Sequence, residues 1–90
     1  MSQEISIKPI DASTYEVTVG GSTPTVHIVN VEPQYSNRLA GSADTETLVR
    51  VSFEFLLARE SNTSILRRFD LPVIGNYFPE YEQEMRKLLR

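Results

Sequence analysis

The sequence predicts an α+β fold, with an N-terminal three-stranded antiparallel meander followed by a mainly helical second half packed on one face of the sheet. Residues 5–31 contain short runs of β-branched and aromatic side chains separated by turn-forming residues, which is typical of strands. Residues 45–59 instead carry apolar side chains at helical spacing. The chain has 90 residues, which is room for one core, so we expect a single small domain over residues 1–90.

The three predicted strands follow one another with short connections, which favours antiparallel pairing. Residues 5–8 and 15–19 alternate apolar and polar side chains, as half-buried strands do. Pro9 lacks a backbone N–H, so the first strand is expected at an edge of the sheet. The third strand, residues 25–31, is rich in β-branched side chains, but its alternation breaks near the middle. We therefore expect it to be either buried on both faces or interrupted by a bulge.

A helix over residues 45–59 is the clearest element of the second half. Four apolar side chains share one of its faces: Leu48, Val49, Phe53 and Leu56. Further apolar side chains widen that face, so this helix is expected to be the central one, packed on the sheet and flanked by other helices. Phe53 and Leu56 lie near the middle of the face and are predicted to be almost wholly buried.

Shorter helices are expected around the central one. A helix begins near Pro33 and is closed by glycine at position 41. Residues 64–69 are compatible with one or two helical turns. Asp70 precedes Leu71-Pro72, which predicts a carboxylate cap on a short helix ending near residue 76. The last helix is expected over residues 79–89, with its acidic side chains early and its basic side chains late.

The composition excludes several classes of protein and of site. There is no cysteine and one histidine, which excludes disulfides, thiolate clusters and multi-imidazole metal sites, and no cofactor is predicted. No apolar run approaches the roughly 20 residues of a membrane span, and no secretory signal is visible, so we expect a cytoplasmic protein. The net charge of −3 disfavours nucleic-acid binding.

No residue pattern predicts catalysis, and no catalytic residue is assigned. His27 is expected to lie on the outer, solvated face of its strand, although Glu16 or Glu32 would be near enough to pair with it. The twelve carboxylates are spaced as surface charges or caps rather than as a catalytic pair. Neither a nucleophile elbow nor a phosphate-binding loop is present.

Two clusters of residues are candidates for contact with a partner. The basic side chains of Arg59, Arg67 and Arg68 form a possible patch for phosphate or for an acidic protein. The alternative is a solvated surface that Glu60 and Asp70 neutralise.

An aromatic group lies close to this patch in the sequence. Phe69, Tyr77, Phe78 and Tyr81 occur within thirteen residues, and Tyr and Phe are enriched at protein interfaces. These four residues, with Val29 of the third strand, are possible interface residues. The alternative is that they fill the second half of the core.

Three segments resemble a known group of proteins. The segments are SFEFLLARE at residues 52–60, SILRRFDLPVI at residues 64–74 and YFPEY at residues 77–81. The chain is similar over residues 26–81 to a group of small uncharacterised prokaryotic proteins. That resemblance implies the strand and helix pattern described above and carries no activity, ligand or catalytic residue.

The leading hypothesis is therefore a non-enzymatic protein-interaction domain that self-associates, most simply as a two-fold homodimer. A three-stranded sheet has two free edges, and proteins must cover or blunt such edges. A second hypothesis is a nucleic-acid-associated or regulatory accessory protein that uses the basic side chains. A third is a ligand-binding or enzyme domain whose site is shared across a dimer interface.

Overall fold

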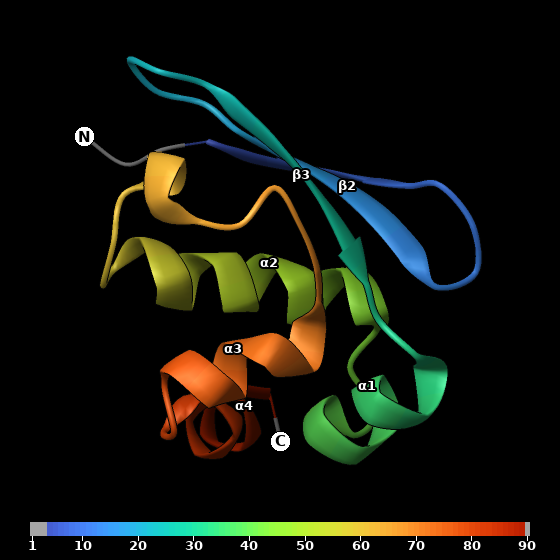
Figure 1. The fold of residues 1–90 in the computed structure, drawn as a ribbon. Helices are drawn as coiled ribbons and strands as arrows, with labels where there is room; N and C mark the ends of the chain where they lie inside the picture. The colour runs from blue at the N-terminus through green and yellow to red at the C-terminus, as the bar shows by residue number, and fades with distance from the viewer. Residues whose placement is uncertain (1–3, 90) are drawn as a thin grey trace.

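The computed structural model describes residues 4–89 and has two layers, a twisted sheet with all the helices on one of its faces (Figure 1). The order of the elements is as follows: β1 (Ile5–Pro9), β2 (Thr14–Val19), β3 (Thr25–Asn30), α1 (Pro33–Ala40), α2 (Thr45–Leu57), the 3₁₀ turn η1 (Asn62–Ser64), β4 (Arg68–Asp70), the 3₁₀ turn η2 (Leu71–Val73), α3 (Ile74–Tyr77) and α4 (Tyr81–Leu89). The predicted α+β class and the placing of the helices on one face are confirmed.

The N-terminal strands form the predicted meander with an unbroken register. β1 pairs with β2 and β2 with β3, both antiparallel, and Val17 lies opposite His27. Both alternatives expected for β3, burial on both faces and a bulge, are wrong. The side chains of Thr25, His27 and Val29 point into the core in regular alternation, whereas Val26 on the other face is 47% exposed. The apparent break in the sequence pattern arises because two of these inward side chains are polar.

The prediction of a sheet with three antiparallel strands is wrong, because within residues 4–89 the sheet has four strands in the order β1-β2-β3-β4. β4 runs parallel to β3, with Val29 opposite Phe69. The helical turns expected over residues 64–69 are also wrong. The Ile28 N–H donates to the Arg67 carbonyl at 2.8 Å, and this bond holds the segment extended beside β3.

A row of polar side chains crosses the outer face of the sheet. The Thr14 hydroxyl donates to Asn30 Oδ1 at 3.0 Å, and Asn30 Nδ2 donates to Asp70 Oδ1 at 3.2 Å. The prediction that the Asp70 carboxylate caps the following helix is wrong, because its side chain forms no hydrogen bond to the backbone of η2. Its carboxylate instead joins β4 to β3.

The central helix α2 is confirmed. Asp44 caps it, with the Thr47 N–H donating to Asp44 Oδ1 at 2.8 Å. Phe53 is 0% exposed and Leu56 is 4% exposed, as the amphipathic pattern predicts. α2 therefore supplies the apolar layer on which the inner face of the sheet rests.

The other helices flank α2. α1 begins at Pro33 and ends at Ala40, and Gly41 closes it with a positive φ of 63° but a ψ of −123°, which lies outside the left-handed helical region typical of such a glycine. In α4, Tyr81 and Met85 are buried, whereas Leu88 is 63% exposed. None of the helices within residues 4–89 combines the length and the apolar character that crossing a membrane requires.

Replacing Phe53 tests the packing of α2 on the sheet. The Phe53→Ala variant is expected to lose about 3–5 kcal/mol of the free energy of unfolding, because its ring lies between those of His27 and Phe69 at centroid distances of 5.4 and 6.1 Å. Urea denaturation measures the loss. Glu54→Ala, an exposed change on the same helix, serves as the control, and equal stability of the two variants would contradict the packing described here.

Candidate functional site

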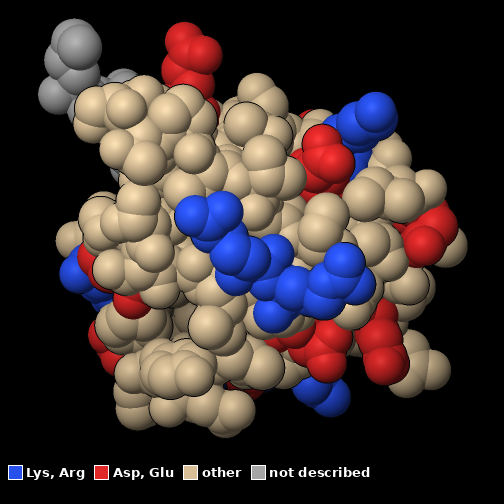
Figure 2. Space-filling model, turned by 45° about the horizontal axis from the view of Figure 1, so that its top comes forward, with Lys and Arg blue, Asp and Glu red and all other residues tan. Residues whose placement is uncertain are grey.

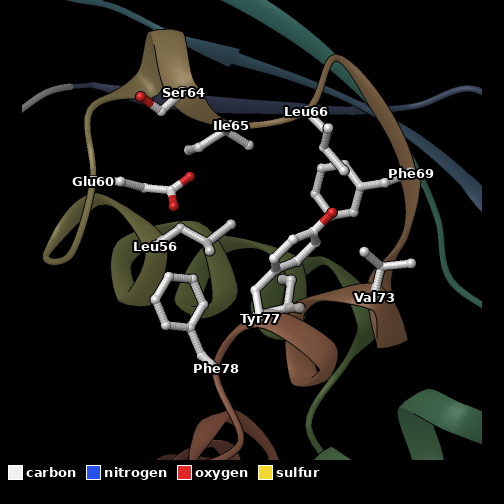
Figure 3. Close-up of a pocket in the computed structure, with 10 residues that line it drawn as sticks. Leu56, Glu60, Ser64, Ile65, Leu66, Phe69, Val73, Tyr77 and Phe78 are labelled. Atoms are coloured by element: carbon white, nitrogen blue, oxygen red, sulfur yellow. The ribbon is translucent and has the colours of Figure 1, made fainter.

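An open groove lies between the end of α2, the segment 60–66, β4 and α3 (Figure 3). We call it the β4 groove. Its volume is about 200 Å³. The following ten residues line it: Leu56, Glu60, Ser64, Ile65, Leu66, Phe69, Val73, Ile74, Tyr77 and Phe78. Most of these side chains are apolar.

The base of the β4 groove is part of the core, and its rim is open to solvent. Ile65, Phe69 and Ile74 are buried and form the base. On the rim, Leu66 is 46% exposed and Tyr77 is 66% exposed. Figure 3 shows the Tyr77 ring extending across the groove toward Leu66 and Phe69. Apolar surface of this kind, held open over a packed base, is typical of a binding site.

One carboxylate faces the β4 groove. Figure 3 shows the Glu60 side chain directed into the space beside Leu56 and Phe78. Within residues 4–89, no Lys or Arg side chain forms a salt bridge with Glu60. Ser64, the other polar lining residue, lies within hydrogen-bond distance of Ser61. The α2 end of the groove can therefore receive an N–H donor or a cation from an occupant.

A buried hydrogen-bond network holds one wall of the β4 groove in place. Asn62 Nδ2 lies 2.9 Å from Thr25 Oγ1 and 2.8 Å from the Thr23 carbonyl. Thr25 Oγ1 lies 2.8 Å from His27 Nε2, and His27 Nδ1 lies 2.7 Å from the Leu66 carbonyl. We call Asn62, Thr25, His27 and the Leu66 carbonyl the His27 network.

The partners fix the protonation of the His27 network. The Leu66 carbonyl can only accept, so His27 Nδ1 carries the hydrogen and donates it. Nε2 of the neutral ring then accepts from the Thr25 hydroxyl, and the Asn62 amide donates to the Thr25 oxygen. Burial lowers the pKa of His27 below its usual value, the positive charge of Arg67 lowers it further, and the Leu66 carbonyl acts in the opposite direction. The arrangement is thus built for the neutral imidazole.

The prediction that His27 lies on the outer face of its strand is wrong. Its side chain is 0% exposed and packs against Phe53. Neither Glu16 nor Glu32 is its hydrogen-bond partner; the segment carrying Leu66, 39 residues away in sequence, satisfies it instead. Only the regular two-residue alternation with Val29 could have indicated this position.

The three predicted basic residues do not form one patch of equivalent side chains. The Arg59 guanidinium lies 3.6 Å from the centre of the Phe55 ring, and its Nε is 3.5 Å from Glu80 Oε2. Arg67 and Arg68 are exposed, and within residues 4–89 neither forms a salt bridge. Figure 2 shows one continuous group of basic side chains near the middle of the face it presents, with other Lys and Arg side chains separate from it.

The five predicted interface residues are divided between core and surface. Val29 and Tyr81 are fully buried within the chain, and Phe69 is nearly so. Phe78 is half-buried and Tyr77 is exposed. Within one chain, therefore, Tyr77 and part of Phe78 are open to a partner, and both line the β4 groove.

Buried polar groups also fix α4 against α2. Ser52 Oγ donates to the Leu48 carbonyl at 2.7 Å, which leaves its oxygen to accept from the Tyr81 hydroxyl at 2.6 Å. Burial raises the pKa of Tyr81, so the phenol stays protonated and can donate. This hydrogen bond fixes Tyr81 at the start of α4, and Phe78, three residues earlier, lines the groove.

A second hollow, of about 480 Å³, lies where β3 and β4 end. It is lined mainly by polar side chains: Ser13, Asn30, Glu32, Gln34, Tyr35, Arg38, Asp70 and Pro72. Several of them already have partners, since Asn30 binds Asp70, Tyr35 donates to Glu82 at 3.0 Å and Arg38 stacks on Tyr35. Within residues 4–89 no three His, Cys, Asp or Glu side chains lie together as metal ligands would.

Comparisons with protein-family models, with curated proteins and with solved structures gave no match to this chain. The site therefore rests on its geometry. Sequence reasoning named Phe69, Tyr77 and Phe78 but missed Leu66 and Val73. Leu66 and Val73 each lie next to an apolar residue that the core buries, Ile65 or Ile74, so no local sequence signal separates them from core residues.

The pH dependence of stability tests the His27 network. The unfolded chain binds a proton at His27 near pH 6.5, whereas the folded chain does so only at lower pH, so protons favour unfolding. The free energy of unfolding is expected to be nearly constant well above pH 6.5 and to fall as the pH drops through 6.5, by up to about 1.4 kcal/mol per pH unit. Urea denaturation between about pH 7.5 and 5.5 measures this slope.

The control is His27→Gln, which keeps a donor and an acceptor but does not titrate. This variant is expected to be less stable than the natural chain by about 1–3 kcal/mol and to show no slope over the same range. An identical slope in both proteins would show that His27 is not held neutral by burial.

Proposed function

We propose that this chain is a non-enzymatic protein-interaction domain and that the β4 groove is its docking site. The observation that carries the proposal is an open apolar groove whose rim residues, Leu66 and Tyr77, leave about half or more of their surface in water. Exposed apolar surface costs free energy in an isolated chain, and a partner that covers it recovers that free energy.

The rigidity of the base supports the proposal. Ile65, Phe69 and Ile74 are core residues, and the His27 network fixes the segment that carries Leu66. A site that is already formed loses little conformational entropy on binding, so even a small apolar contact contributes to affinity.

The β4 groove coincides with the segments that carry the resemblance, although the resemblance itself implies no function. Every residue that lines the β4 groove lies within residues 52–60, 64–74 or 77–81, the three segments that resemble the prokaryotic group. Part of that likeness is accounted for by the core side chains of α2. The rim residues Leu66 and Tyr77 have no such packing role, and a docking function accounts for their apolar character.

Self-association through the same groove is the second candidate. Tyr77 is both a rim residue and the most exposed of the large apolar side chains within residues 4–89. A two-fold axis beside it would place the Tyr77 ring of each copy over the groove of the other, in one self-complementary patch. A homodimer of this kind would leave the function as an interaction domain unchanged.

A protein partner is favoured over nucleic acid. The net charge of −3 opposes binding to phosphates, and Arg59 is engaged by Glu80 rather than joined to Arg67 and Arg68. A ligand or catalytic site shared between two copies ranks behind both, since the lining of the groove is mostly apolar. The cytoplasm stays the predicted compartment, and the proposal requires no cofactor.

A pair of matched variants tests the docking site. The fluorescent probe anilinonaphthalene sulfonate is expected to bind the natural chain in the β4 groove. Leu66→Asp should weaken this binding by about tenfold or more, because it places a charge on the rim. Leu88→Asp makes the same change at an exposed leucine outside the groove and should leave binding unchanged.

Sedimentation of the same proteins tests the second candidate. A mass near twice the 10.2 kDa of one chain, reduced to one chain by Leu66→Asp and not by Leu88→Asp, would identify a homodimer through the groove. If the probe does not bind the natural chain and no dimer forms, or if both variants behave alike, the β4 groove is not the docking site.

A further inference from the structure

The two edges of the sheet differ in their protection. At β1, Arg50 Nη1 of helix α2 donates to the Ile5 carbonyl at 2.8 Å. Pro9 has no N–H to offer, and Lys8 places an exposed charge on the same strand. A bonded carbonyl, a proline and a lysine are the means by which proteins prevent strand pairing at an edge. β1 is therefore closed to a further strand.

The edge at β4 carries the exposed charge of Arg68, but within residues 4–89 it has neither a proline nor a side chain bonded to an outward carbonyl. The Ile28 N–H donates to the Arg67 carbonyl, so the backbone groups of residues 67 and 69 point toward β3. The N–H and C=O of Arg68, between them, point away from β3. β4 is the last strand of the sheet, so no strand pairs with these two groups.

The β4 groove lies directly below this open edge. Phe69 projects from the inner face of β4 and lines the groove, while Arg68 and Asp70 project to the outer face and are exposed. A strand added beside β4 would continue the sheet over the groove. Its inward side chains would enter the groove next to Phe69, because side chains alternate between the two faces of a strand.

We infer that the partner is an extended peptide segment that pairs with β4 as a fifth strand, an inference that rests on the docking function proposed above. The segment carries a Glu or Asp opposite Arg68 and an apolar residue on each side of it. The carboxylate lies on the outer face beside the Arg68 guanidinium, and the two apolar side chains fill the β4 groove. This mode joins main-chain bonds to pockets for alternate side chains.

The charges on the molecule favour this chemistry. Arg68 has no salt-bridge partner within residues 4–89, and opposite charges directly across a strand pair stabilise it. Arg67 adds a second exposed positive charge beside it. Glu60, at the other end of the groove, accepts an N–H or a cation from the end of the same segment. The partner segment is therefore acidic at β4 and not acidic at the α2 end.

A charge-exchange experiment tests the inference. The probe is a fluorescein-labelled heptapeptide with the core Ile-Glu-Ile between Thr and Ser residues, and fluorescence anisotropy measures its binding. We expect saturable binding to the natural chain and a loss of about tenfold or more in affinity with Arg68→Glu. A second peptide with the core Ile-Lys-Ile should bind Arg68→Glu better than it binds the natural chain. Lys8→Glu, a charge reversal on the protected edge, should change neither affinity.

Amide hydrogen exchange gives an independent measurement. Bound peptide should slow exchange of the Arg68 N–H, because that group gains a main-chain acceptor. Exchange of the Ile7 N–H, which faces outward at the β1 edge, should be unaffected. Slowing at Arg68 together with the charge-exchange result establishes strand addition.

Other results would distinguish the docking site proposed for the groove from the fifth strand inferred here. If the peptide binds, is weakened by Leu66→Asp, and is indifferent to Arg68→Glu, the β4 groove is a docking site but the fifth strand is wrong. The same follows if the peptide fails to bind while anilinonaphthalene sulfonate does. A second copy found seated in the groove, or a DNA oligonucleotide that binds through Arg68 when the peptide does not, also overturns the inference.

Discussion

The His27 network is the constraint on which the rest of the structure depends. It joins β3 to the segment that follows α2, through Asn62 at one end and the Leu66 carbonyl at the other. All its buried groups have partners, and breaking one contact leaves a buried donor or acceptor unsatisfied at a cost of about 1–3 kcal/mol. The pairing of β4 with β3 and the position of the wall that carries Leu66 both follow from it.

That constraint also explains why a groove remains. The network and the bond from Ile28 to Arg67 hold the segment close to β3, but β4 then runs for only three residues before η2 turns the chain toward α3. The sheet stops over the end of α2, and the chain has no further strand within residues 4–89 to cover Phe69. The open edge and the β4 groove thus have one cause. At the opposite edge, Arg50 binds the Ile5 carbonyl.

The sequence predicted the elements whose signals are local and missed those that depend on distant pairing. The antiparallel pairing of β1, β2 and β3 and the helix α2 were predicted correctly, because their alternation and helical spacing are visible within short stretches of sequence. β4 was missed because three residues are too few to show alternation and because its partner lies 40 positions away, as in the pair of Asn30 with Asp70. The β4 groove combines three separate segments, and His27 seemed exposed because the segment that covers it, which carries the Leu66 carbonyl, lies 39 residues away.

Native-state hydrogen exchange in a Thr25→Val variant tests most directly whether the His27 network holds β4 in place. Valine keeps the shape of threonine but removes the hydroxyl that links Asn62 to His27. The account predicts that the opening free energy of the Ile28 N–H, which bonds to the Arg67 carbonyl, falls more than that of the Val31 N–H, which bonds to the Ser13 carbonyl near the β2 end. Equal changes at the two amides would contradict it, because β4 would then be held by the fold as a whole.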